Sequence, residues 1–290
     1  MKKTIVAAAV LLIAAVLLSS CSFNLFNNFN FSSFTDSEKY EVGNIEYSAD
    51  AIKKIDIEWV FGNIMIIPSH SDKLTVTEIE DNLDDDMKMR TLIDEDTLKI
   101  KFCKSGFSAS IFKSPDKRLS VEIPEGVSLT VSSVSGAIKL GMETDSIPAE
   151  AELFNLSEIN LKTISGDITV TSLLNKIKCD NATVSTVSGD VDVISLYCSE
   201  IDRDNNADSS IKVDSVSGNV RLAGNFNKND VSTVSGNVSF SAFIGAIDFD
   251  SISGKLRTNA SYTDESGTYV FGKGEYFAKV KTVSGNLTVE

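Results

Sequence analysis

The clearest pattern of hydrophobic and polar positions in this sequence is a short motif that recurs seven times between residues 131 and 287. Counted from a glycine, positions −5, −2 and +2 are always apolar, position −3 is always Ser or Thr, and position −1 is always Ser. Position +1 is Asp or Asn in five of the seven copies. A fixed motif repeated along a chain is typical of stacked β-strand units. The seven glycines are Gly136, Gly166, Gly189, Gly218, Gly236, Gly254 and Gly285.

The alternation inside each copy predicts strands that turn a corner. Positions −2, 0 and +2 share one parity, so they are expected to line one face of a strand, whereas positions −7 and −5 have the other parity. The inward face must therefore change between −5 and −2, and a bulge or corner at the Ser/Thr is the expected place. The glycine is expected where the chain needs a missing side chain or a positive φ. Hydroxyls at −3 and −1 are expected to form ladders between stacked copies.

The spacing of the copies favours a β-solenoid over an antiparallel meander. Successive glycines are separated by 18 to 31 residues, and the shortest interval suits one solenoid rung, the longer ones being rungs with loops. In the alternative, Ser-Gly-Asn/Asp is a hairpin turn, but a hairpin does not explain the constant Ser/Thr at −3. We therefore expect an all-β, single-chain β-solenoid built from Val-Ser-Gly-Asp/Asn rungs.

The region before the regular copies also predicts strands. Residues 55–66 resemble a degenerate eighth copy, with Phe61 in place of serine before Gly62, and residues 74–79, 98–102 and 119–123 alternate as strands do. Pro124-Glu125-Gly126 predicts a turn. No helical periodicity is seen after residue 20. We expect an N-terminal β region of degenerate rungs over 41–125 and regular repeats over 126–290.

The strand–Pro-Glu-Gly–strand segment followed by repeated Val-Ser-Gly-Asp/Asn-Val resembles a bacterial β-strand-repeat envelope family of candidate adhesins, also called toastrack domains. The resemblance covers about residues 45–290. It implies a β-helix-like solenoid and an exported protein, in some members linked to envelope-stress systems. It implies no catalytic residues.

The first 21 residues predict export and a lipid anchor. Met1-Lys2-Lys3 precedes an apolar run from Ile5 to Leu18, which suits a signal peptide and is short for a membrane span. Leu18-Ser19-Ser20-Cys21 resembles a bacterial lipobox, which implies cleavage after residue 20 and a diacylglyceryl group on Cys21. Residues 21–40 predict an Asn/Phe-rich tether, whose phenylalanines are expected either at the membrane interface or packed on the domain.

The net charge of the protein limits the classes of partner that it is expected to bind. Asp and Glu outnumber Lys and Arg by 41 to 27, giving a net charge of −14, which argues against nucleic acid and against electrostatic binding to anionic lipid. The single histidine, His70, excludes a multi-histidine metal site and is expected in a surface loop. We expect no cofactor and no metal.

Few residues in the sequence suggest a catalytic, metal-binding or ligand-binding site. Residues 202–208 resemble a calcium loop but carry Ala207 where glycine is needed, so a solvated acidic loop is expected. Asp167 and Asp190 are candidate paired carboxylates on stacked rungs, although turn chemistry explains them better. A Cys179–Cys198 bridge competes with simple burial of both thiols. Aromatic residues that could form a sugar-stacking platform are more simply explained as core or end-cap residues: Trp59, Tyr262, Tyr269, Phe271, Tyr276 and Phe277.

These observations predict a non-enzymatic lipoprotein, held at the cell membrane through Cys21 and facing away from the cytoplasm. Its expected role is adhesin-like binding or scaffolding at the cell envelope, with a glycan or a membrane protein as candidate partner. One alternative is an envelope-stress sensor that acts with a membrane partner. A second alternative is a polysaccharide-processing enzyme that uses Asp167 and Asp190.

Overall fold

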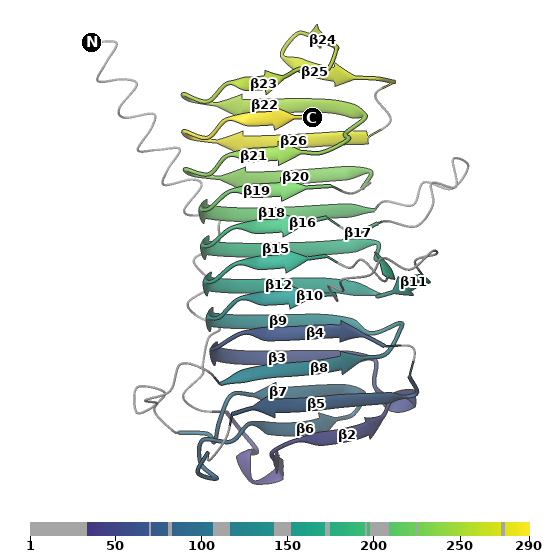
Figure 1. The fold of residues 1–290 in the computed structure, drawn as a ribbon, viewed down its shortest axis with the longest axis vertical. Coiled ribbons are helices and arrows are strands. Elements are labelled where there is room, and N and C mark those ends of the chain that lie inside the picture. The colour runs from purple at the N-terminus through teal and green to yellow at the C-terminus, as the bar shows by residue number, and fades with distance from the viewer. Residues whose placement is uncertain are drawn as a thin grey trace.

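The protein is an elongated β-solenoid with two long sheets that face each other across a continuous core (Figure 1). The structure is a computed structural model and describes residues 34–69, 71–80, 83–106, 117–141, 152–171, 175–194, 196–197, 209–223, 226–273 and 276–290. Thirteen stacked strands at about 4.8 Å each give a length of about 60 Å. This architecture confirms the all-β solenoid expected from the sequence.

The first sheet, sheet A, contains the long strand of every rung. In spatial order its strands are β1 (Glu41–Val42), β6 (Arg90–Asp94), β7 (Thr97–Lys101), β3 (Lys54–Phe61), β9 (Ser128–Ser135), β12 (Glu158–Ser165), β15 (Asn181–Ser188), β18 (Ser210–Ser217), β20 (Lys228–Thr233), β26 (Tyr276–Thr282), β22 (Gly245–Ser251), β25 (Thr268–Phe271) and β24 (Tyr262–Glu265).

The second sheet, sheet B, contains the shorter strand that follows each corner. Its spatial order is β2 (Ile45–Ser48), β5 (Lys73–Ile79), β8 (Arg118–Ile123), β4 (Ile64–Pro68), β10 (Ile138–Leu140), β13 (Ile168–Val170), β16 (Val191–Val193), β19 (Val220–Leu222), β21 (Val238–Phe240), β27 (Leu287–Val289) and β23 (Leu256–Thr258).

Three rungs have a third wall, sheet C, made of β11 (Glu152–Asn155), β14 (Asn175–Lys178) and β17 (Leu196–Tyr197). Two short 3₁₀ helices, η1 (Ser37–Lys39) and η2 (Ala49–Ala51), lie at the N-terminal end. Among the described residues, no helical segment has the length and apolar character that a membrane span requires.

Neighbouring rungs pair in parallel and in register, which excludes the antiparallel meander for the repeats. Val184 of β15, for example, pairs with Leu161 of β12 on one side and Val213 of β18 on the other. Equivalent apolar side chains therefore stack on one another inside the solenoid, and Leu161, Val184 and Val213 are completely buried. Such columns explain why the apolar positions of the motif are constant.

The rungs at both ends do not follow chain order. Near the C-terminus, β26 lies between β20 and β22, so Val280 pairs with Val231 on one side and with Phe249 on the other. Near the N-terminus, β3 lies between β7 and β9. At the C-terminal end, β22 and β23 therefore form the outer rung, and the later strands β26 and β27 lie between this rung and the rung of β20 and β21. The strands of sheet A thus follow chain order from β9 to β20 and depart from it at both ends of the solenoid.

Antiparallel strands close the N-terminal end of the solenoid. Strand β6 pairs antiparallel with β7 and β1, and β5 pairs antiparallel with β8 and β2. Pro124-Glu125-Gly126 forms the expected turn, with Gly126 at a φ of +79°. We call residues 34–106 and 117–123 the N-terminal cap, apart from the rung formed by β3 and β4.

Candidate functional site

The repeated corner between sheets A and B is built on a column of glycines. A Cβ atom on Gly136 would overlap the carbonyl oxygen of Gly62, and one on Gly166 would overlap that of Gly136. The same relation continues through Gly189, Gly218, Gly236, Gly285 and Gly254, in spatial order. Of these eight glycines, only Gly62 has a positive φ. The motif therefore needs glycine for close stacking of backbones rather than for a special backbone conformation.

The buried Ser/Thr at −3 forms hydrogen bonds to the backbone of this corner. The Thr233 and Thr282 hydroxyls accept hydrogen bonds from the backbone N–H of Gly236 and Gly285, at 3.0 and 2.8 Å. Thr163 instead donates to the carbonyl of Gly136 on the neighbouring rung, at 3.5 Å. These side chains are buried, so the hydroxyls satisfy backbone groups that water cannot reach. The expected hydroxyl ladder at −3 is thus replaced by hydroxyl-to-backbone bonds.

The apolar residue at −2 points outward, which corrects the predicted facing. In β12, Ile159, Leu161 and Thr163 are buried and Ile164 is half-buried, so alternation continues unbroken through −3. The inward face changes across Ser165-Gly166-Asp167, and Ile168 at +2 is buried again. The corner lies at Ser-Gly-Asx and not at the Ser/Thr. The parity argument placed it too early because an apolar residue was assumed to be an interior one.

The outer surface of the corner therefore carries three parallel columns, which we call the corner stripe. One column contains the outward Val/Ile residues at −2, the second the exposed serines at −1, and the third the Asx residues at +1. The exposed serines are Ser135, Ser165, Ser188, Ser217, Ser235, Ser284 and Ser253, in spatial order. An exposed serine is thus repeated about every 4.8 Å along the molecule, and five of the seven rungs add an Asx residue beside it.

Hydrogen bonds between rungs hold the Asx column in place. Asp167 Oδ1 accepts the backbone N–H of Asp190 at 2.9 Å, and Asp190 Oδ1 accepts the N–H of Asn219 at 2.7 Å. Asn237 and Asn286 extend the same ladder through their own side-chain amides, each bonded to the Asn Oδ1 of the preceding rung. The structure does bring Asp167 and Asp190 together, but it uses an oxygen of each to bind the next rung.

The N-terminal cap contains a buried ion pair that the sequence did not reveal. Lys117 is fully buried, and its Nζ lies 2.7 Å from Glu78 Oε1 and 4.0 Å from the ring centre of Phe102. Its Nζ also donates to the backbone carbonyls of Met87 and Phe102. Burial lowers the pKa of Lys117 below its ordinary value, and the Glu78 carboxylate opposes that shift. A lysine at the start of a strand gave no signal of burial.

Trp59 belongs to the same cluster and not to an exposed sugar-stacking platform. Its side chain is completely buried, its ring lies 4.9 Å from that of Phe102, and Lys117 Nζ lies 5.1 Å from its ring centre. The Trp59 Nε1–H has no hydrogen-bond partner among the described residues. The core interpretation of Trp59 was therefore right.

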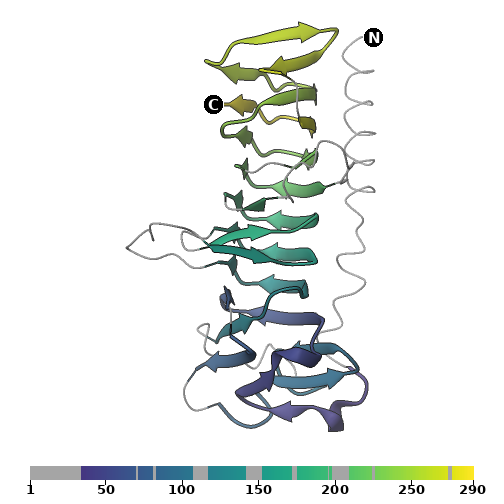
Figure 2. The same ribbon diagram turned by 90° about the vertical axis from the view of Figure 1, so that its right-hand side faces the viewer.

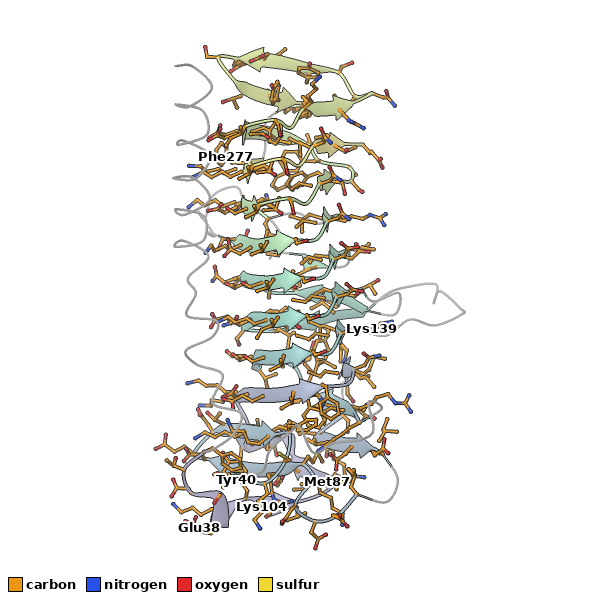
Figure 3. The ribbon with its side chains drawn as sticks, turned by 90° about the vertical axis from the view of Figure 1, so that its left-hand side faces the viewer. Glu38, Tyr40, Met87, Lys104, Lys139 and Phe277 are labelled. Atoms are coloured by element: carbon orange, nitrogen blue, oxygen red, sulfur yellow. The ribbon has the colours of Figure 1, made fainter. Side chains whose placement is uncertain are left out.

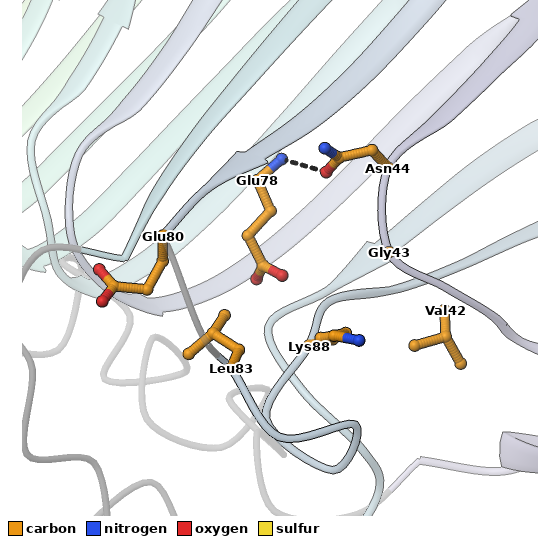
Figure 4. A pocket seen from close by; sticks show the side chains of 7 residues that line it. All are labelled: Val42, Gly43, Asn44, Glu78, Glu80, Leu83 and Lys88. Atoms are coloured by element: carbon orange, nitrogen blue, oxygen red, sulfur yellow. Dashed lines mark hydrogen bonds between the residues drawn. The ribbon is translucent and has the colours of Figure 1, made fainter.

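A pocket of about 400 Å³ opens beside this cluster (Figure 4). The Glu78 backbone N–H donates to Asn44 Oδ1 across its wall at 2.8 Å. Glu78 and Glu80 make the wall acidic, and Lys88 lies opposite. No group of three or more His, Cys, Asp or Glu side chains suited to a metal ion occurs in the part of the chain that the structure describes. The pocket is lined by Val42, Gly43, Asn44, Glu78, Glu80, Leu83 and Lys88.

The chain enters the described structure at the N-terminal cap. Phe34 exchanges hydrogen bonds with the Ser105 side chain at 2.9 and 3.0 Å, and its ring lies 4.7 Å from that of Tyr40. Lys101 Nζ lies 5.9 Å from the Phe34 ring centre. Figure 3 shows Tyr40, Glu38 and Lys104 together at this end, far from Phe277. At least the last phenylalanine of the expected tether thus packs on the domain.

Several predicted residues lie outside the described residues: Cys21, His70, Cys198 and the acidic loop 202–208. The signal peptide and most of the tether lie outside them too. Cys103 and Cys179 are buried.

Comparison with known proteins identifies the family. The model of the family called Toastrack DUF4097 matches residues 52–290, so the chain belongs to the toastrack family. No protein with a curated description matches it significantly.

Three solved structures are similar over most of their length. A candidate adhesin from Bacteroides fragilis is 13% identical with a TM-score of 0.45, covering 86% of this chain and 97% of that one. A candidate cell adhesion protein from Clostridium sporogenes is 12% identical with a TM-score of 0.34, covering 87% and 99%. A candidate adhesin from Parabacteroides distasonis is 12% identical with a TM-score of 0.31, covering 86% and 97%.

Proposed function

We propose that this protein is a non-enzymatic, adhesin-like binding protein, anchored by a lipid on Cys21 to the outer side of the cell membrane. The corner stripe carries the proposal. It presents hydroxyl, amide and carboxylate groups in register along the solenoid, beside a half-buried apolar column. A polymer with its own repeat, such as an envelope glycan, suits such a surface because successive rungs offer similar contacts to successive segments of the polymer.

The position of Phe34 supports the anchored arrangement. Cys21 precedes Phe34 by 13 residues, which span at most about 45 Å when extended. Phe34 is fixed to the N-terminal cap, so an anchor on Cys21 would keep that cap near the membrane. The C-terminal end of the solenoid would then point outward. Labelling with a fatty acid in growing cells tests the anchor: wild-type protein should incorporate label, and the Cys21→Ala variant should not.

The binding proposal is tested by a pull-down with the full chain in detergent. Purified protein is mixed separately with cell-wall glycan, lipid vesicles and detergent-solubilised membrane proteins. We expect retention by glycan and loss of retention in Ser188→Lys/Ser217→Lys, which places two long cations on the corner stripe. The matched control is Ser48→Lys/Ser71→Lys, at exposed serines of the N-terminal cap. Equal retention of both variants would contradict the use of the corner stripe.

The contact of Phe34 with Tyr40 and Ser105 favours one second candidate, an envelope-stress sensor. This contact gives the tether a physical connection to the domain through which a membrane signal would pass. Retention by one membrane protein, lost on deletion of residues 23–34, would favour this role. For the enzymatic alternative, hydrolysis of a polysaccharide that disappears in both Asp167→Asn and Asp190→Asn would be required.

A further inference from the structure

We propose that two copies of this protein bind each other end to end through their C-terminal tips. The tip is defined as β22, β23 and the β24–β25 hairpin, which forms the top of the molecule in Figure 2. The first observation is that the two sheets differ in the number of strands that they have at the C-terminal end. Beyond the rung of β3 and β4, each sheet has three further strands at the N-terminal end, whereas beyond β22 and β23 sheet A has two further strands and sheet B has none.

The tip therefore ends in two strand edges that have no partner in the described part of the chain, β24 in sheet A and β23 in sheet B. Unpaired edges of this kind pair readily with another strand. All four residues of β24 are exposed, and so is Arg257 in the middle of β23. The N-terminal cap, by contrast, ends with the two sheets level.

The two edges have opposite charge. Strand β24 contains Asp264 and Glu265, whereas β23 contains Arg257 and directly follows Lys255. None of these four side chains forms an ion pair within the described residues. In a pair related by a two-fold axis, β24 of each copy meets β23 of the other, so the acidic edge faces the basic edge twice. This charge complementarity, in a chain with a net charge of −14, identifies a second copy as the partner.

The backbone positions agree with antiparallel pairing of these edges. The Leu287 N–H donates to the Lys255 carbonyl, so the backbone groups of Leu256 and Thr258 face away from β27 toward the free edge. The hairpin turns at Ser266 and Gly267, both with positive φ, which makes Glu265 and Thr268 the hydrogen-bonded pair next to the turn. Asp264 and Tyr262 then direct their backbone groups to the free edge of β24.

A single register satisfies both edges. Asp264 opposite Leu256 of the second copy, and Tyr262 opposite Thr258, place hydrogen-bonding positions against each other. The same register puts Glu265 opposite Lys255 and Thr263 opposite Arg257.

Apolar exposure at this end supports the same contact. Ile244, Ile252, Tyr262 and Phe277, on the tip or the loop and strand next to it, are 41 to 48% exposed. Combined with the proposed function, on which this consequence rests, a tip contact would join two rods whose anchored ends point in opposite directions. Such a contact would hold two membranes together.

Cross-linking tests the contact with the full chain in detergent. An Arg257→Cys chain and a Thr263→Cys chain, carrying different tags, are oxidised alone and as a mixture, with the wild-type chain as background. A non-hydrogen-bonded pair on antiparallel strands has a Cα separation that a disulfide can bridge. We expect a disulfide-linked dimer containing both tags from the mixture and none above background from either chain alone. Absence of the mixed dimer, or equal dimer from the single chains, would overturn the proposal.

A charge exchange tests the partner independently of cysteine chemistry. By sedimentation of the full chain in detergent, Glu265→Lys should weaken dimerisation by about ten-fold or more, and Glu265→Lys/Lys255→Glu should restore it to within about three-fold. Failure of the double variant to restore dimerisation, although it unfolds at the same temperature as wild type, would overturn the contact. Unchanged thermal unfolding of the variants is the folding control.

Vesicles separate this contact from the anchor. When the wild-type chain is inserted in each of two vesicle populations, the vesicles should cluster. The Glu265→Lys variant should not cluster them. A dimer in detergent without vesicle clustering would support the tip contact and contradict the anchored arrangement. Glycan retention is measured on the corner stripe variants and is unaffected by either result.

Discussion

Gly189 lies directly against the backbone carbonyl of Gly166, one rung away along the solenoid. A methyl group at Gly189 would overlap this carbonyl, and backbone cannot move aside without separating the rungs. We expect Gly189→Ala to lower the free energy of unfolding by about 2–3 kcal/mol or more. Chemical denaturation measures this change. Ser188→Ala, at the exposed neighbouring position, is the matched control and should change stability by no more than about 0.5 kcal/mol.

The outward direction of position −2 can be tested within one rung. Leu161 at −5 is completely buried, whereas Ile164 at −2 is half-buried on the outer surface. Leu161→Ala should therefore cost about 2–5 kcal/mol, and Ile164→Ala less than about 1.5 kcal/mol. Equal losses of unfolding free energy in the two variants would indicate that Ile164 is an interior residue, which would contradict a corner at Ser165-Gly166-Asp167.

The buried pair of Lys117 and Glu78 should stabilise the N-terminal cap only while both partners are present. Lys117→Met leaves the Glu78 carboxylate buried without its cation and should cost about 3–5 kcal/mol. Glu78→Gln in the same chain removes the uncompensated charge and keeps an acceptor for the Met89 N–H, so most of the loss should be recovered. A double-mutant cycle by denaturation measures the difference. Additive losses would contradict this account.

Tyr40 should make the protein less stable in strong base. Burial, with help from Glu58 and Asp56, raises the pKa of Tyr40 to about 12 in the folded protein. An unfolded tyrosine loses its proton near pH 10, so between about pH 10 and 12 the unfolded state binds fewer protons and stability falls as pH rises. The contribution is fully present below about pH 10 and amounts to at most about 3 kcal/mol.

The Tyr40→Phe variant provides the comparison. Its unfolding free energy, measured from pH 9 to 12, should decline less steeply than that of wild type. Parallel curves for the two proteins would show that Tyr40 titrates as an exposed tyrosine does.

Much of the fold could be predicted because its signals are local. Alternation with a period of two in Leu161–Thr163 and its equivalents defines strands, and the recurrence of one motif predicts that the strands stack as parallel copies. The Phe61-Gly62 segment was also recognisable, and Gly62 does lie at the base of the glycine column. Strand direction, register and the glycine column all follow from the repeat itself.

Other features depend on contacts that the repeat does not contain. An apolar residue before Ser-Gly has the same identity whether it faces inward or outward, so only the corner geometry shows that Ile164 lies outside. Nothing local distinguishes Lys117 from the exposed lysines, because its burial depends on Glu78 and on the carbonyls of Met87 and Phe102, which are distant in the sequence.

The sequence by itself determined the class of fold, the rung and the serine and Asx residues of the corner, because these follow from side-chain alternation and from one repeated motif. Only the tertiary structure decided the order of the terminal rungs, the closed N-terminal cap and the two unpaired edges at the tip. The physical reason is that all rungs have nearly the same edges. A copy such as β26 fits beside β20 or beyond β22 equally well by its own pattern, and only the folded structure shows that it lies between them.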